Sequence, residues 1–107
     1  MKIAVKKLEN RKKITLVVEK FDIANMQEIK RNIEGELKGY RGNILIDFSH
    51  VKFIDSSGLS VIIAVFKQLN KIKKKLELCG LQKQPTELLE ITQLHKILTI
   101  VNSCNGQ

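Results

Sequence analysis

Two serines stand between an aspartate and a glycine in the tetrapeptide Asp55-Ser56-Ser57-Gly58. An apolar strand at residues 43–48 and then the apolar pair Phe53-Ile54 precede them, and an amphipathic segment follows. This order predicts that both hydroxyls lie at a strand-to-helix turn. Such turns lie at the carboxyl edge of an open α/β sheet, where ligands and partners bind. Aspartate, serine and glycine are also ordinary residues at the start of a helix, so a purely structural capping role is the alternative interpretation.

The residues around these serines disfavour an enzyme. A serine hydrolase elbow requires Gly-x-Ser-x-Gly, whereas residues 54–58 read Ile-Asp-Ser-Ser-Gly. His50 and His95 are the two histidines, and no neighbouring residue marks either one as a general base. The sequence has no phosphate-binding loop, no dinucleotide fingerprint and no acidic grouping typical of a metal centre. We therefore predict no catalytic residue, no metal ligand and no cofactor.

The composition is that of one globular domain. The chain has 107 residues, of which 43% are hydrophobic and 28% charged, and this suffices for a single core. An acidic partner, a membrane surface or a nucleic acid could each account for the net charge of +8. The five aromatic residues show no spacing suited to base stacking, so we expect no direct contact with nucleic acid. The charge is interpreted mainly as solvation of the surface or as the mark of a lysine-rich proteome.

Cysteine content and hydropathy predict a soluble protein of the cytoplasm. Cys79 and Cys104 form no Cys-x-x-Cys or Cys/His motif, so we expect two free thiols, as in a reducing cytosol, rather than a zinc site or a disulfide. The first residues carry no apolar stretch of signal-peptide length. No apolar run approaches the ~20 residues of a membrane span, so no span is expected.

Short β-branched segments and apolar stripes predict the elements. Residues 3–8 and 14–19 form a hairpin, and 14–18 is expected to be little exposed. Asp22 can cap the first helix, and a second helix covers about residues 57–73. Further predictions are strands at 43–48, 76–79 and 97–101, and a third helix that Pro85 starts and Gln84 or Thr86 caps. The stripe residues expected inside are Ile23, Met26, Ile29, Ile33 and Leu37 in the first helix and Leu88, Leu89 and Ile91 in the third.

The resulting order, β-β-α-β-α-β-α-β, predicts an α/β fold. Strands that alternate with helices form a mostly parallel sheet with the helices packed against it, and the N-terminal hairpin adds one strand. No linker or internal repeat divides the chain, so residues 1–107 are expected to be one domain.

Several segments resemble one known family. Residues 53–62, Phe-Ile-Asp-Ser-Ser-Gly-Leu-Ser-Val-Ile, are similar to the signature of the STAS domains of bacterial anti-sigma factor antagonists. Residues 44–48, 76–81 and 88–94 also match in kind, so the resemblance covers roughly residues 3–101. It implies a single STAS domain over residues 1–107.

This resemblance implies a phosphorylation switch and not an enzyme. In the family the serine after the aspartate, here Ser56, is phosphorylated by an anti-sigma factor that is itself a serine kinase using ATP, and Ser57 is the second candidate. The unphosphorylated antagonist binds the anti-sigma factor and frees the sigma factor, and a serine phosphatase restores it. A monomer is expected. The residues expected to bind the partner are Asp22, Asp55, Ser56, Ser57, Gly58 and Leu59.

One departure from the family concerns the end of the second strand. The family usually has Gly-Glu-Leu-Asp there, where this chain has Glu19-Lys20-Phe21-Asp22. Asp22 is thus either the acidic residue that contacts the kinase or a plain helix cap. Two alternative functions remain: the STAS subunit of a lipid-transporting ABC system, for which a basic surface would suit, and a partner-switching regulator outside transcription.

Overall fold

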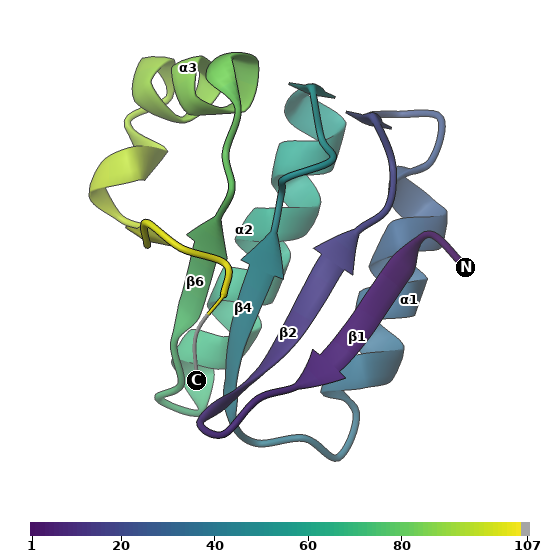
Figure 1. Cartoon of the computed structure of the whole chain (residues 1–107), viewed down its shortest axis with the longest axis vertical. Helices are drawn as coiled ribbons and strands as arrows, with labels where there is room; N and C mark the ends of the chain where they lie inside the picture. Colours follow the sequence, from purple (N-terminus) through teal and green to yellow (C-terminus); the bar gives the residue numbers. More distant parts are fainter. Residues whose placement is uncertain (106–107) are drawn as a thin grey trace.

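A five-stranded sheet forms the centre of the molecule in a computed structural model that describes residues 1–105 (Figure 1). Its strands lie in the order β1-β2-β4-β6-β7. β1 pairs antiparallel with β2, and the other neighbours are parallel. This is the predicted α/β fold with an N-terminal hairpin. The strands span Ile3–Lys7 (β1), Arg11–Leu16 (β2), Asn43–Asp47 (β4), Leu76–Cys79 (β6) and Thr99–Ile100 (β7).

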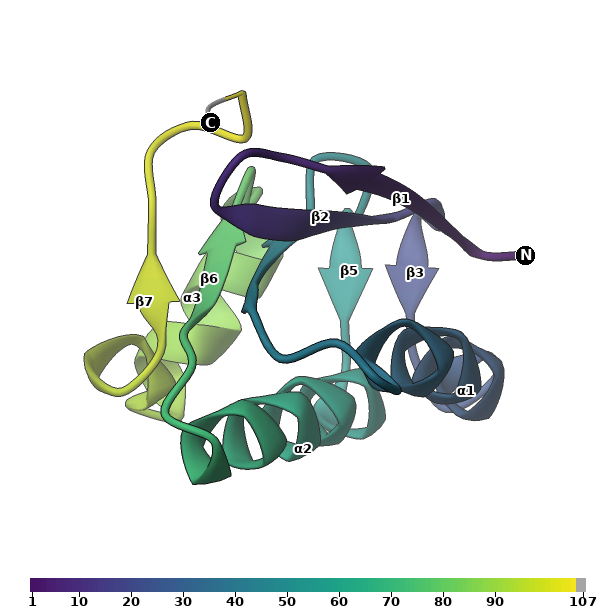
Figure 2. The same ribbon diagram turned by 90° about the horizontal axis from the view of Figure 1, so that it is seen from below.

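Two long helices, α1 (Met26–Leu37) and α2 (Ser56–Lys71), cover one face of this sheet (Figure 2). A separate pair of two-residue parallel strands, β3 (Lys20–Phe21) and β5 (Phe53–Ile54), leads into them. The sequence analysis missed β3 and β5, because two residues are too few to show a periodic pattern. No helix within residues 1–105 is long and apolar enough to cross a membrane.

Alternating side chains on the central strand β4 define the two faces of the sheet. Ile44 and Ile46 belong to the core under α1 and α2, whereas Leu45 and Asp47 lie on the opposite face. Leu45 is nevertheless fully buried, because Lys13 and Glu77 flank it on the neighbouring strands. The largest fully buried side chains are Phe21, Phe48, Ile14, Leu16, Ile29, Ile33, Ile44, Leu45, Ile46, Ile62, Leu78 and Val51.

The hairpin and the last strand are confirmed with different bounds: β1 ends one residue early, β2 begins at Arg11, three residues before its predicted start, and β7 is shorter than predicted. β2 ends at Leu16, and Val17, which was expected to be little exposed, is 49% exposed. β7 contains two residues instead of the five expected at 97–101. No helix follows it as far as Asn105, the last residue that the structure describes.

The third helix also differs in detail from its prediction. α3 (Lys83–Ile91) begins two residues before Pro85, and Gln82 occupies its N-cap position in place of Gln84 or Thr86. Ile91, which was expected inside, is 78% exposed because it is the last residue of the helix. A short 3-10 turn, η1 (Leu94–Lys96), then leads into β7.

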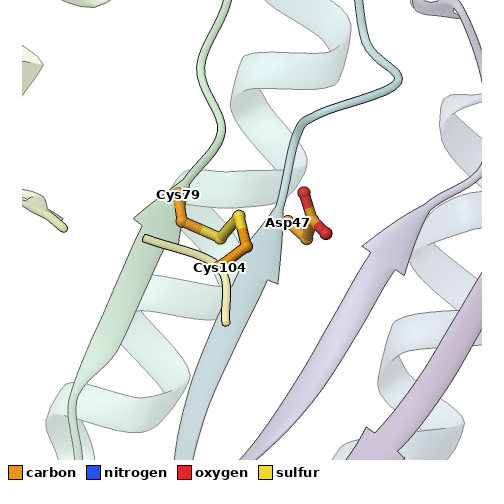
Figure 3. Close-up of side chains that lie close together, drawn as sticks. All are labelled: Asp47, Cys79 and Cys104. Atoms are coloured by element: carbon orange, nitrogen blue, oxygen red, sulfur yellow. A yellow bond between two sulfur atoms is a disulfide. The ribbon is translucent and has the colours of Figure 1, made fainter. Parts of the chain in front are cut away.

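The expectation of two free thiols was wrong. Cys79, at the end of β6, forms a disulfide with Cys104, and their Cα atoms are 5.4 Å apart (Figure 3). The pairing arises because β7 runs parallel to β6 and returns the C-terminal segment to the same edge of the sheet. The bond lies beside Asp47, and the Lys13 ammonium donates to the Cys104 carbonyl at 3.1 Å. Asp47, Cys79 and Cys104 thus lie close together because the disulfide joins the C-terminal segment to the end of β6, beside the end of β4.

Candidate functional site

The predicted strand-to-helix turn lies where β5 ends at Ile54 and α2 begins at Ser56. Ser56 is the first residue of α2 and its side chain is exposed, whereas Ser57 is half-buried. The hydroxyl of Ser56 is therefore open to another macromolecule. We call this surface, made of Asp22, Ile23, Asp55, Ser56 and Ser57, the Ser56 corner.

Asp55 holds the corner together through both of its carboxylate oxygens. Oδ1 accepts a hydrogen bond from the Gly58 amide at 2.9 Å, which caps α2 as the sequence predicts. Oδ2 accepts from the Ile23 amide at 3.1 Å, in the loop between β3 and α1. Because the two oxygens are engaged by backbone amides, Asp55 orients the loops around Ser56 and not the serine hydroxyl itself.

The loop that Asp55 binds contains Asp22, which the sequence analysis left as a kinase contact or a helix cap. α1 begins at Met26 with Asn25 in the N-cap position, so Asp22 is not the cap residue. Its carboxylate instead accepts from the Ala24 amide at 3.0 Å, which fixes a tight turn beside the corner. The structure thus brings Asp22 and Asp55 to one place, although they are 33 positions apart in the chain.

Ile23 is the residue that the sequence analysis misjudged most. It was expected on the buried stripe of the first helix, but the helix starts three residues later and its side chain is 71% exposed. Phe53, on β5, is also 40% exposed. Exposed apolar side chains that gather beside polar groups mark protein contacts. The helical spacing of Ile23 led the sequence analysis to place this side chain in the core instead.

Gly58 explains why β3 can lie so close to α2. A Cβ atom at this position would lie 2.4 Å from the Phe21 carbonyl oxygen and 2.9 Å from Ile54 Cγ1. The chain's own strand β3 therefore makes a close backbone approach to α2 at Gly58. Gly58 and Leu59 are both buried, and Leu59 is only 6% exposed. They were expected in the partner-binding surface, but they lie beneath the Ser56 corner and support it.

Gln84 supports the corner from the other side. Its side-chain amide accepts from the Ile54 N–H and donates to the Ile54 carbonyl, both at 2.9 Å. These bonds satisfy the free edge of β5 in the way a third strand would. The sequence analysis considered Gln84 only as a helix cap, because nothing in the sequence shows that α3 lies over β5.

The start of α2 offers donors to an anion at this corner. The first backbone amides of a helix have no hydrogen-bond acceptor within that helix. At the start of α2, the Gly58 amide donates to the Asp55 side chain instead. The amides of Ser56 and Ser57 precede it, and within residues 1–105 no acceptor is found for either. Together with the helix dipole, they would stabilise a negative group attached to Ser56.

Replacing Asp55 by alanine should lower the free energy of unfolding by about 1 kcal/mol, because it removes the side-chain cap of α2. Urea unfolding followed by circular dichroism measures this loss. Asp55→Asn, which keeps an oxygen acceptor, should recover part of it, and Asp22→Ala should cost less because its turn is exposed. An unchanged midpoint for Asp55→Ala would contradict the capping role.

Comparison with known proteins identifies the family of this chain. Residues 3–105 match the model of the STAS domain. The chain belongs to the STAS family. The match covers nearly the whole described chain, so the family assignment includes the Ser56 corner.

Similar proteins come from several bacteria. BtrV of Bordetella bronchiseptica, assigned as an anti-sigma factor antagonist, is 28% identical over 80 residues, which cover 75% of this chain and 69% of BtrV. The anti-sigma-B factor antagonist of Listeria monocytogenes is 40% identical over 57 residues, which cover 53% of this chain and half of that protein. The chain thus resembles antagonists of anti-sigma factors in sequence.

Solved structures agree with this STAS fold. The crystal structure of a Thermotoga maritima protein, also assigned as an anti-sigma factor antagonist, superposes with a TM-score of 0.83 at 25% identity and covers 95% of this chain and 87% of that one. The Bacillus cell fate determinant SpoIIAA in its phosphorylated form superposes with a TM-score of 0.71 at 16% identity, covering 94% of this chain and 92% of that one. The latter likeness concerns the fold alone.

Proposed function

We propose that this STAS domain is an anti-sigma factor antagonist: a binding switch that is turned off when Ser56 is phosphorylated. In the unphosphorylated form it binds an anti-sigma factor with serine kinase activity, and the sigma factor is released. The observation that carries the proposal is the exposed Ser56 side chain at the first residue of α2, in a corner that Asp55 holds in shape.

Ser56 is favoured over Ser57 as the phosphoryl acceptor. A kinase must reach the hydroxyl, and Ser56 is exposed whereas Ser57 is half-buried. The Ser57 carbonyl also accepts a hydrogen bond from the Ser60 hydroxyl at 2.6 Å, which ties Ser57 into the first turn of α2. Ser56 can therefore enter a kinase site with little distortion of the helix.

Phosphorylation at this position would change binding without unfolding the domain. A phosphoryl group adds about 1.5 to 2 negative charges, which the helix dipole and the free amides of Ser56 and Ser57 stabilise. At an interface the same group brings bulk and charge next to Asp22 and Asp55. A charge left buried and unpaired at an interface costs about 2 to 5 kcal/mol, enough to release a partner.

An exposed apolar side chain, Ile23, supplies an anchor for the partner. Ile23 is 71% exposed, and its amide is bonded to Asp55, so its position is fixed relative to Ser56. Pre-organised apolar residues at the centre of an interface contribute most of its binding energy. We infer that the docked kinase covers Ile23 together with Asp22 and the two serines. A phosphate on Ser56 would then lie inside the interface and weaken the complex.

The remaining features of the switch follow from the same proposal. A serine phosphatase would remove the phosphate and restore binding, and the domain would act as a monomer, with residues 1–107 as one unit and no catalytic activity of its own. We place it in the cytoplasm with its kinase.

Phosphate mapping tests the acceptor directly. The purified protein is incubated with ATP and its cognate anti-sigma factor kinase, and the modified peptide is identified by mass spectrometry. We expect one phosphate on Ser56 and near-complete loss of labelling in Ser56→Ala, because the hydroxyl nucleophile is gone.

Ser57→Ala is the matched control, and it should still be labelled. Equal labelling of wild type and Ser56→Ala would overturn the assignment of the acceptor. Absence of any complex between the unmodified protein and the kinase, measured by calorimetry, would overturn the antagonist function itself.

A further inference from the structure

Three segments meet at the end of the molecule opposite the Ser56 corner (Figure 1). They are residues 7–11, which form the β1–β2 turn with one residue of each strand, residues 38–42 between α1 and β4, and residues 71–75, which run from the last residue of α2 to β6. Because β2, β4 and β6 are parallel, the segments that enter them lie at the same edge of the sheet. We call these three segments the basic pole.

The basic pole carries almost all of the net charge of the chain. It holds eight Lys and Arg residues and one acidic residue, Glu9, so seven of the eight net positive charges lie there. The rest of the chain is nearly neutral, with eleven basic and ten acidic residues. The charge is thus concentrated at one end, which solvation spread over the surface does not explain.

Seven of these cations are available to a partner. Arg11 is the exception, since it pairs with Glu77 at 2.7 Å, and the nearby Glu36 is paired with Lys12 at 3.3 Å. Within residues 1–105 no ion pair involves the others, and all of them are exposed. They are Lys7, Lys38, Arg41, Lys71, Lys73, Lys74 and Lys75.

The basic pole lacks the features of a specific phosphate or nucleic-acid site. α1 and α2 end here, so their anion-binding amide ends point to the opposite end of the molecule. Its aromatic residue, Tyr40, cannot stack on a base, because its hydroxyl donates to the Asn43 carbonyl at 2.9 Å and the Lys12 ammonium lies 4.4 Å from its ring centre. Burial raises the pKa of Tyr40, so its hydroxyl stays neutral.

A cavity of about 210 Å³ also lies at this end, but it does not gather the cations. Leu37, Leu69 and Ile72 are among its lining residues, and Arg41 is the one charged residue that lines it. The lysines instead stand on three separate segments around it. Cations spread in this way are suited to bind several anionic groups that lie apart from one another, and not a single ligand held in the cavity.

A specific protein partner is also disfavoured at the basic pole. The exposed large apolar side chains within residues 1–105, such as Ile23, Phe53 and Ile97, all lie outside the three segments. Stable protein interfaces have a buried apolar or aromatic centre surrounded by a polar rim. A surface of lysines without such a centre is instead suited to bind a broad, flat surface that carries many negative charges.

We propose that the basic pole holds this domain on an anionic lipid surface. Each lysine close to such a surface strengthens binding about fivefold, and the attraction falls off within about 8 Å at physiological salt. Binding through this end would leave the Ser56 corner, at the other end of the strands, facing away from the lipid and open to its kinase. The inference goes beyond the antagonist function and does not depend on it.

Vesicle flotation of the full chain tests this proposal. Vesicles of phosphatidylcholine alone are compared with vesicles that also contain phosphatidylglycerol, at low salt and at about 0.5 M salt. The pole variant is Lys71→Gln, Lys74→Gln, Lys75→Gln; Lys73 is left unchanged because its φ of 60° is left-handed. The control variant is Lys20→Gln, Lys83→Gln, Lys96→Gln, which removes the same charge from exposed positions outside the basic pole.

We expect binding to the phosphatidylglycerol vesicles at low salt, and loss of binding on pure phosphatidylcholine or at high salt. The pole variant should bind on the order of 100-fold more weakly, and the control variant should stay close to wild type. Circular dichroism checks that both variants are folded. Equal weakening of the two variants, no binding to the anionic vesicles, or tighter binding to duplex RNA or DNA than to them at the same salt would overturn the proposal.

Discussion

Gly58→Ala should destabilise the domain by about 1 to 2 kcal/mol, because overpacking against backbone costs about 2 to 3 kcal/mol and outweighs the gain of about 1 kcal/mol in helix propensity. The new methyl group would lie 2.4 Å from the Phe21 carbonyl oxygen, which belongs to backbone and cannot swing away. Either β3 or α2 must shift, and both bear the Ser56 corner. The loss is measured as the change in unfolding free energy in urea.

Gly35→Ala provides the matched control for this substitution. Gly35 lies inside α1, and no atom lies within 4 Å of a Cβ built there. Alanine at this position should therefore stabilise the protein by about 0.5 to 1 kcal/mol through helix propensity alone. Opposite signs for the two variants are expected, and a stabilising Gly58→Ala would contradict the close packing of β3 on α2.

Ser56→Asp should weaken the complex with the anti-sigma factor kinase by about 30-fold to several thousandfold, which corresponds to about 2 to 5 kcal/mol of lost binding energy. The carboxylate places a charge at the first residue of α2, where the interface would bury it. The stability of the domain should hold or rise slightly, because acidic residues in the first turn favour a helix. Isothermal titration calorimetry measures the affinity, and circular dichroism measures the helix content.

The control for this effect is Ser103→Asp, which adds the same charge at an exposed position of the C-terminal segment. Its affinity for the kinase should remain within a few-fold of wild type, since distant surface charges are screened by salt. If both aspartate variants bound like the wild type, a charge at position 56 would not be what dissociates the complex.

Several elements could be predicted because their information is local. The stripe of Ile29, Ile33 and Leu37 repeats at helical spacing, and all three are buried in α1. The run Ile44-Leu45-Ile46 is buried on both faces, as expected of a central strand. The order of the elements then restricts the topology to a mostly parallel sheet, which is the sheet observed.

The errors concern residues whose environment depends on distant segments. Ile23 continues the helical spacing, yet it is exposed because its amide is bound by Asp55 and the helix starts only at Met26. Cys79 and Cys104 lack a sequence motif, and they meet because β7 returns the chain beside β6. The lysines of the basic pole come from three separate segments that a parallel sheet brings to one edge.

The sequence by itself determined the succession of strands and helices and the turn at Asp55-Ser56-Ser57-Gly58, because spacing, capping and turn preferences act within a few residues. Only the tertiary structure decided that Asp55 accepts a hydrogen bond from the Ile23 amide and that Gly58 lies against β3. It also decided that the positive charge lies at the basic pole. Such contacts join residues 30 or more positions apart, and packing of the whole chain selects them.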